Sequence, residues 1–211
     1  MSLRPELPEY CRASALYRKL QTGAPTSKNK DAKRKVKQKA KLARVIMSFQ
    51  VIPYTPEHIE TCLAIWNEVV RDGIAFPQED ELTVESGHAF FSMQTFTGLA
   101  RHEETGEIAG LYILHPNNVG RCGHICNASY AVASKWRGHH IGETLVRHSI
   151  NQGKQCGFRI LQFNAVVRTN ESALALYRKL GFVQLGVIPG GFRKKDGSFE
   201  DIIPHYRILR K

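Results

Sequence analysis

The sequence predicts an α/β fold in which helices cross over a mixed central sheet. Short apolar stretches typical of strands alternate along the chain with longer stretches whose apolar residues recur at helical spacing. A strand-like stretch that starts at Asn127 passes through a basic, glycine-containing turn into an amphipathic run. A second strand over 161–167 is followed by a polar break and a short helical stretch. This alternation of strands and helices is typical of sheets covered by helices.

The positive charge is concentrated at the N-terminus. The chain has 211 residues and a formal net charge of +11, but residues 1–47 hold 13 Lys and Arg against 3 acidic residues, a net charge of +10. The rest holds 17 against 16, so it is nearly neutral. We therefore predict a basic extension over 1–46, expected to be disordered, and one domain over 47–211. The extension could be a nuclear or mitochondrial address, an RNA or ribosome contact, a membrane-surface tether, or a tail without a role in catalysis.

The cysteines favour a reducing compartment, so we expect a cytoplasmic protein. There are five, an odd number without a paired framework. Cys122 and Cys126 flank His124, but no second pair has zinc-ligand spacing, so we expect buried or half-buried thiols and no metal. No apolar run approaches the ~18–20 residues of a membrane span.

The first half of the domain reads as a strand, two helices and a hairpin. Pro53 and Pro56 end the first strand, the next stretch has an apolar helical stripe, and Gly106 marks the turn of the hairpin. We expect a strand over 49–54, a helix over 58–70, a loop over 71–83 and a short helix over 89–94. The two hairpin strands are expected over 98–102 and 108–114.

The second half alternates strands with helices. Its central strand leads into the basic turn, and Gly181-Phe182 begins a later strand. We expect strands over 122–132, 159–167 and 182–188, with helices over 142–156 and 171–180 between them. A turn-rich excursion over 189–201 and a last strand over 205–209 follow.

The turn between the central strand and its helix has the features of a phosphate site. The first turn of a helix has unpaired N–H groups and a partial positive charge, and glycine lets the backbone approach an anion closely. No Gly-Lys-Ser/Thr closes this turn, and no GxGxxG with an acidic ribose ligand is present. A P-loop and a dinucleotide fold are therefore not predicted.

Two motifs resemble those of the GNAT acetyltransferases. The turn 137–142 is similar to the family signature R/Q-x-x-G-x-G/A, with His140 in place of the middle glycine. The later ending N-x-x-A-x-x-L-Y-x-x-x-G-F is matched by Asn170, Ala173, Leu176, Tyr177, Gly181 and Phe182. The resemblance covers about 49–209 and implies the GNAT fold, an acetyl-CoA-dependent N-acetyltransferase and no metal.

The resemblance also implies which residues hold acetyl-CoA. The pyrophosphate would lie on the turn and first helical residues, which are Arg137, Gly138, His139, His140, Ile141, Gly142 and Glu143, and the Arg137 guanidinium would add positive charge. The edge of the central strand at Tyr130 and Val132 would pair with pantetheine, and Asn170 and Ala173 would lie further along it. Asn170 could equally cap its helix. His140 would need a negative φ or a left-handed conformation that histidine can adopt.

Tyr177 stands where the family has its general acid. It would protonate the leaving thiolate of coenzyme A. The alternative is that its ring is simply packed in the core beside Leu176 and Phe182.

The acceptor side departs from the family. Phosphinothricin-type members have a glutamate where this chain has Asn127, and asparagine cannot take a proton. With Asn164 on the adjacent strand, we expect Asn127 to position the acceptor amine; alternatively, the two amides satisfy each other. Phe76, in the loop expected over this site, would bind the acceptor. The amine proton would leave through water toward Glu79, Glu81 or His88, and Arg193 or Lys194 would supply charge for an acceptor carboxylate.

Asn127, Asn164 and the stretch IPGGFRKKDGSFEDI (188–202) together resemble the fungal proline-analogue acetyltransferases, which act on azetidine-2-carboxylate and similar ring amines. We therefore predict acetylation and detoxification of a small proline-like amine. The alternatives are a protein or ribosomal N-acetyltransferase and a non-catalytic RNA- or ribosome-associated adaptor. The family often dimerises through its C-terminal strands, so a homodimer is expected.

Overall fold

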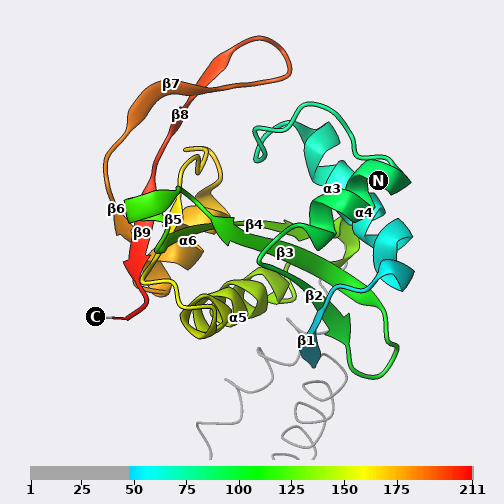
Figure 1. Cartoon of the computed structure of the whole chain (residues 1–211). Coiled ribbons are helices and arrows are strands. Elements are labelled where there is room, and N and C mark those ends of the chain that lie inside the picture. The colour runs from blue at the N-terminus through cyan, green and yellow to red at the C-terminus, as the bar shows by residue number, and fades with distance from the viewer. Residues whose placement is uncertain (1–47, 211) are drawn as a thin grey trace, which may run out of the picture. The chain divides into compact units, whose positions relative to one another are not determined.

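A mixed seven-stranded sheet forms the centre of the domain (Figure 1). The structure is a computed structural model and describes residues 48–210. The predicted basic extension over 1–46 lies outside these residues. The strand order is β1-β2-β3-β4-β5-β9-β6, and the strands are β1 (Phe49–Pro53), β2 (Phe96–His102), β3 (Ile108–Pro116), β4 (Ile125–Val132), β5 (Ile160–Phe163), β9 (His205–Ile208) and β6 (Val183–Gln184).

The sheet contains both strand senses. The strands β1 to β4 form an antiparallel meander, β4 and β5 are parallel, and β9 is antiparallel to both β5 and β6. The predicted α/β class with a mixed sheet is confirmed.

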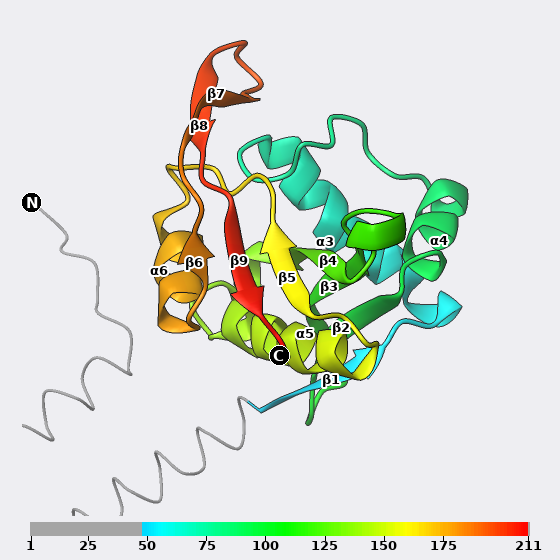
Figure 2. The same cartoon turned by 60° about the vertical axis from the view of Figure 1, so that its left-hand side comes forward.

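Helices cover both faces of the sheet, as Figures 1 and 2 show. On one face, α3 (Ile59–Asp72) and α4 (Val84–Ser92) pack on a core that includes Trp66, Phe91 and Leu111. On the other face, α5 (Ile141–Gln155) and α6 (Glu171–Lys179) pack on a core that includes Tyr112 and Leu145. The site described below depends on these two faces being chemically different.

Local sequence signals set the helix ends. Gly73 ends α3 in the left-handed conformation (φ 63°), which costs glycine little. Thr83 and Ser86 form a capping box at the start of α4, so this helix begins at Val84 rather than at the predicted residue 89. The Asn170 side chain caps α6 by accepting a hydrogen bond from the Ala173 N–H (3.2 Å).

The C-terminal region differs most from the prediction. The expected strand over 182–188 is reduced to two residues, and the excursion over 189–201 forms a separate hairpin of β7 (Ile188–Arg193) and β8 (Phe199–Ile202). Phe192 and Ile202 bury their side chains against Val167, which gives the hairpin an apolar contact that its glycines concealed in the sequence.

Four cysteines lie in the described part of the chain, and all are free thiols. Cys62 and Cys126 are buried, but Cys122 is exposed, so the expectation of a buried or half-buried Cys122 was wrong. The turn of residues 120–122 before β4 places it at the surface. Between residues 48 and 210, no cluster of His, Cys, Asp and Glu could hold a metal ion, and no helix is long and apolar enough to cross a membrane.

Candidate active site

The strands β4 and β5 diverge after a short contact. β4 pairs with β3 from Cys126 to Val132, but with β5 only at Ile125 and Cys126. The hydrogen bonds from Asn117 N–H to Ile125 O (2.8 Å) and from Ala133 N–H to Ala109 O (3.0 Å) show that the odd-numbered residues of β4 bond to β3.

The even-numbered residues of β4 therefore direct their backbone N–H and C=O groups into the opening. Tyr130 and Val132, which were predicted to pair with pantetheine, are two of them, and Ala128 is the third. At about 3.3 Å per residue, the exposed edge from Asn127 to Val132 is about 17 Å long. An extended chain with amide groups can bond along such an edge as a further strand would.

The opening leads to the N-terminus of α5. His140 is the N-cap, with φ 63° and ψ 15°, so it adopts the left-handed one of the two conformations that were expected to be possible for it. Among the described residues, no hydrogen bond within the protein engages the N–H groups of Gly138, His140, Ile141, Gly142 and Glu143. Such a group of free N–H donors at a helix N-terminus suits a phosphate.

Gly142 leaves room for this anion. A Cβ built on Gly142 would meet only Leu176 Cδ2, at 3.8 Å, so neither packing nor backbone conformation in the protein requires glycine here. The missing side chain keeps the surface outside the free N–H groups open. The residues present thus fit a pyrophosphate.

Arg137 has a different part from the one predicted for its side chain. Its Nη2 lies 3.4 Å from Glu68 Oε1 and 3.2 Å from Asp72 Oδ2, and its N–H donates to Ser134 O (3.1 Å). Because α3 already compensates this charge, the guanidinium ties the turn to α3 instead of adding free charge to the phosphate site. The His139 N–H is likewise used, by Trp136 O (3.4 Å).

Glu143 is surrounded by cations from two helices. Its carboxylate accepts a hydrogen bond from Lys179 Nζ on α6 (2.7 Å) and from Arg147 (2.8 Å). The Lys179 ammonium, followed by Arg147, lowers the pKa of this carboxyl group. The positive groups offset the one carboxylate in the first turn of α5 and link α5 to α6.

Tyr177 on α6 lies beside the opening, among aromatic rings. Its ring centroid is 4.5 Å from that of Phe163 on β5, 5.5 Å from Phe182 and 5.9 Å from His205. Burial raises the pKa of Tyr177 well above its ordinary value, so the phenol keeps its proton at neutral pH. No other residue of the described chain forms a hydrogen bond with its hydroxyl. The site therefore contains both the predicted acid and the aromatic packing of the alternative interpretation.

The amides of Asn127 and Asn164 on the acceptor side do not hydrogen-bond to each other. Asn127 Oδ1 accepts from the N–H of Ala128 (2.8 Å), whereas Asn164 exchanges hydrogen bonds with Asn117 (2.6 and 3.3 Å) and accepts one from Gln162 (2.9 Å). The alternative interpretation, in which Asn127 and Asn164 satisfy each other, was therefore wrong. Asn164 is also exposed rather than enclosed in an apolar cleft. Sequence reasoning missed Asn117 because it lies in the β3–β4 turn, outside any motif.

The acceptor-side residue Asn127 and the predicted acid Tyr177 lie on opposite faces of the sheet. Asn127 shares a face with Ala131, which packs in the α3/α4 core, whereas the Tyr130 side chain packs on the α5/α6 face with Phe163 and Tyr177. The opening between β4 and β5 joins the faces. A carbonyl in it can be approached by an amine from one side while Tyr177 serves the leaving group on the other.

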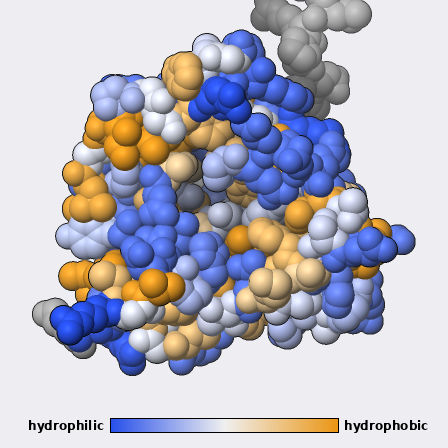
Figure 3. All heavy atoms as spheres, turned by 45° about the horizontal axis from the view of Figure 1, so that its top comes forward, coloured by the Kyte–Doolittle hydropathy of each residue, from blue (hydrophilic) through white to orange (hydrophobic). Residues whose placement is uncertain are grey.

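The loop over 73–83 and the β7–β8 hairpin meet above the α3/α4 face. Arg193 Nη2 lies 2.5 Å from Glu79 Oε1, and Lys195 Nζ donates to Arg71 O (3.0 Å). Figure 3 shows this side of the molecule, with a central hollow bordered mainly by hydrophilic residues. Phe76, predicted to touch the acceptor, is instead buried against Trp66 (ring centroids 4.4 Å apart), so its ring forms part of the core.

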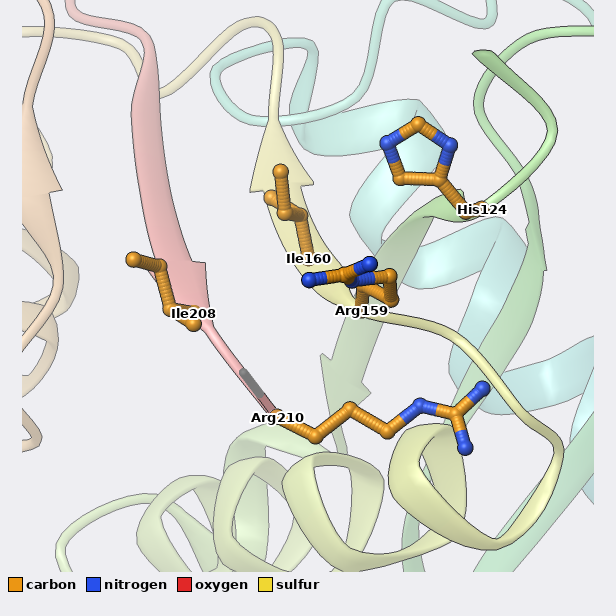
Figure 4. Close-up of a pocket in the computed structure, with 5 residues that line it drawn as sticks. All are labelled: His124, Arg159, Ile160, Ile208 and Arg210. Atoms are coloured by element: carbon orange, nitrogen blue, oxygen red, sulfur yellow. The ribbon is translucent and has the colours of Figure 1, made fainter. Parts of the chain in front are cut away.

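A pocket in the described chain lies elsewhere. It has a volume of about 360 Å³ and is lined by His124, Arg159, Ile160, Ile208 and Arg210, at the N-terminal end of β5 (Figure 4). Neither Asn127 nor Tyr177 lines it. We locate the candidate site at the diverging strands because that is where backbone donors, the acid and the amides converge.

Comparisons with known proteins agree with this geometry. Residues 63–182 match the model of the Acetyltransferase (GNAT) family. N-acetyltransferase aca1 of Schizosaccharomyces pombe is 33% identical over 103 residues, which are 48% of this chain and 49% of that protein. The chain thus matches about half the length of this curated relative.

Solved structures share the fold. A GCN5-related N-acetyltransferase from Kribbella flavida has a TM-score of 0.70 and 29% identity, over 76% of this chain and 97% of that one. A GNAT superfamily phosphinothricin acetyltransferase from Sinorhizobium meliloti, solved in complex with AcCoA, has a TM-score of 0.71 and 21% identity, over 77% of this chain and 89% of that one. The family model covers more than half of the sequence, and the diverging strands and the open helix N-terminus lie within it: the chain belongs to the GNAT family of acetyltransferases.

Proposed function

We propose that this chain transfers an acetyl group from acetyl-CoA to the amine nitrogen of a small molecule. The observation that carries the proposal is the loss of β4–β5 pairing after Cys126, which leaves a row of backbone groups leading to the free N–H groups of α5. Acyl transfer needs both a grip on the donor and an open approach to its carbonyl.

The residues divide the work between binding and proton transfer. The free N–H groups of Gly138, His140, Ile141, Gly142 and Glu143 bind the pyrophosphate, and the β4 edge orients pantetheine. Bound there, acetyl-CoA supplies the activated acyl group. Tyr177 donates a proton to the sulfur as the C–S bond breaks. Alkyl thiols have a pKa near ~8.5, so the thiolate is a weaker base than a phenolate. The donated hydrogen bond therefore helps most in the transition state, while negative charge develops on the sulfur.

We propose a compact, proline-like acceptor, with detoxification of such an analogue in the cytoplasm as the role. The amides Asn117, Asn127 and Asn164 can orient an amine and a carboxylate by hydrogen bonds. The hairpin tip carries Arg193, Lys194 and Lys195, which disfavour a basic peptide. Arg193 and Lys194 are already close to Glu79 and Glu200 (2.5 and 3.9 Å), so recognition of a carboxylate would rest more on amides than we expected from the sequence.

A thiol-release assay tests this function. Azetidine-2-carboxylate, spermidine and a lysine-rich peptide are each supplied with acetyl-CoA. We expect turnover to be fastest with azetidine-2-carboxylate. Preference for the peptide would support a protein acetyltransferase, and no thiol release or acetyl-CoA binding with any of them would support a non-catalytic adaptor.

Asn127→Ala and Asn164→Ala should each lower kcat/KM for the acceptor by about twofold to tenfold, because one hydrogen bond is worth ~0.5–1.5 kcal/mol. Acetyl-CoA affinity, measured by calorimetry, should not change. Asn118→Ala is the matched control, since Asn118 is an exposed asparagine of the β3–β4 turn. Asn127→Glu should shift the pH profile if Asn127 contacts the reacting nitrogen. Full activity and an unmoved profile in all three variants would contradict the assignment.

We also propose a homodimer. β6 is an edge strand of the sheet. Exposed apolar side chains run from this strand to the start of the β7–β8 hairpin: Val183, Leu185, Val187 and Ile188, which are between 42% and 58% exposed. A second copy that covers this edge would bury these side chains and pair the unpaired backbone groups.

The chain from Met47 to Lys211 should keep its specific activity and its dimer mass in sedimentation. The removed residues carry a net charge of +10 but none of the site residues. Loss of activity in a folded truncation would place the extension in catalysis. Salt-sensitive RNA retention by the full chain alone would assign the extension a nucleic-acid or ribosome contact.

A further inference from the structure

We propose that His115 is the base that accepts the acceptor amine's proton. The inference rests on the proposed function and supplies the group that Asn127 cannot provide. His115 lies directly opposite Asn127 in the β3–β4 ladder. It belongs to a hydrogen-bonded antiparallel pair, in which Cα atoms are about 5.5 Å apart and both side chains project from the same face.

That face is the acceptor face. Leu111 and Ile113, at the same alternate positions of β3 as His115, pack in the α3/α4 core. His115 is thus on the side of the sheet where Asn127 lies and opposite to Tyr177. It stands at the point where β4 and β5 begin to diverge, which is the end of the β4 edge farthest from the phosphate site. An acyl carbonyl held at that end would lie between Tyr177 on one face and His115 on the other.

The hydrogen bonding of His115 leaves one nitrogen available. Nδ1 lies 3.0 Å from the carbonyl oxygen of Pro116, and a carbonyl can only accept, so Nδ1 carries the hydrogen. In the neutral ring, Nε2 then has the free lone pair. His115 is half-buried, so this nitrogen can exchange a proton with water.

The carboxylates predicted for this task are occupied. Glu79 lies 2.5 Å from Arg193, and Glu81 lies 2.6 Å from Arg71. Each of these two carboxylates therefore already has a guanidinium partner. His88 is hydrogen-bonded to the Tyr54 hydroxyl (3.0 Å), and Tyr54 directly follows β1, which is three strands away from β4 in the sheet, whereas His115 lies directly opposite Asn127.

Other ionisable groups do not compete directly. The amides of β4 and β5 on this face do not titrate. The elements on this face are α3, α4 and the β3–β4 turn, and their ionisable side chains include Glu68, Arg71, Asp72, His88, Arg121 and His124. Within the described residues, no ion pair or hydrogen bond joins any of them to His115.

The proton balance needs such a group. An amine with a pKa near ~10.4 is about one part in a thousand neutral at pH 7.4. Each turnover removes two protons from the nitrogen. His115 accepts the first at Nε2, freeing the lone pair that attacks the carbonyl carbon, and passes this proton to water. The second proton passes to water as the tetrahedral intermediate collapses, while Tyr177 protonates the sulfur and is reprotonated from water.

The test compares the pH dependence of kcat/KM in wild type and His115→Gln. The acceptor is azetidine-2-carboxylate, or spermidine if that alone is turned over. Loss of general-base help should lower kcat/KM at neutral pH by about 10²-fold or more, and the remaining rate should follow the neutral fraction of the amine, which rises about tenfold per pH unit up to the amine's own pKa. Acetyl-CoA affinity should be unchanged. His124→Gln, a nearby exposed histidine outside the site, should behave as wild type.

His115→Ala with added imidazole separates catalysis from structure. Restored activity and a wild-type melting temperature support the base, whereas activity lost without rescue, or together with stability, makes His115 structural and overturns the proposal. An unchanged pH profile in active His115→Gln overturns it too, while the proposed function stands. Failure of the wild-type chain to acetylate any amine would instead overturn the proposed function, and with it this inference.

Discussion

Tyr177→Phe is expected to lower kcat by about 10²–10⁴-fold, the usual worth of general acid help, while acetyl-CoA affinity changes little. The substitution removes only the hydroxyl. The ring contacts with Phe163 and Phe182, at 4.5 and 5.5 Å between centroids, can persist because phenylalanine has the same ring. Burial keeps this phenol protonated, which is the form an acid requires.

Single-turnover thiol release measures the loss directly, because it isolates the bond-breaking step. Tyr54→Phe is the control, since it removes a hydroxyl that bonds His88 instead. An unchanged rate in Tyr177→Phe would show that the ring is structural and that water protonates the thiolate.

Gly142→Asp is expected to weaken acetyl-CoA binding at least tenfold, or about 1.4 kcal/mol. The new carboxylate would lie beside the free N–H groups of α5, where it would repel the pyrophosphate and compete for the same donors. The fold should survive, because only Leu176 comes near a Cβ at this position.

Gly142→Asn separates charge from shape, because it has nearly the same volume without the charge. Calorimetry should show a smaller loss of affinity for Asn than for Asp. Equal losses would mean that bulk alone excludes the ligand, and unchanged affinity in both variants would remove this turn from the acetyl-CoA site.

Contiguous features of this domain could be predicted from the sequence. The helical stripe of α3, the hairpin of β2 and β3, and the turn before α5 each depend on neighbours within a few residues. Local propensity and spacing therefore determine them. The same holds for Asn170, whose capping contact reaches only three residues along the chain.

Contacts between residues that are far apart in the sequence could be identified only from the folded structure. The ion pairs of Arg137 with Glu68 and Asp72, and of Arg193 with Glu79, join residues far apart in the sequence. No periodicity encodes such contacts, so the sequence could suggest these charges but not that partners already neutralise them. The hairpin over 188–202 was missed for the same reason, because its apolar contact is with Val167.

The acceptor side shows this division most clearly. The sequence identified Asn127 as the residue that replaces a titratable one, because that follows from a strand motif. The cross-strand partner of Asn127 depends on register, which is fixed by side chains packing on two faces of a sheet and by the turn between β3 and β4. Folding therefore placed His115 opposite Asn127 and Asn117 against Asn164.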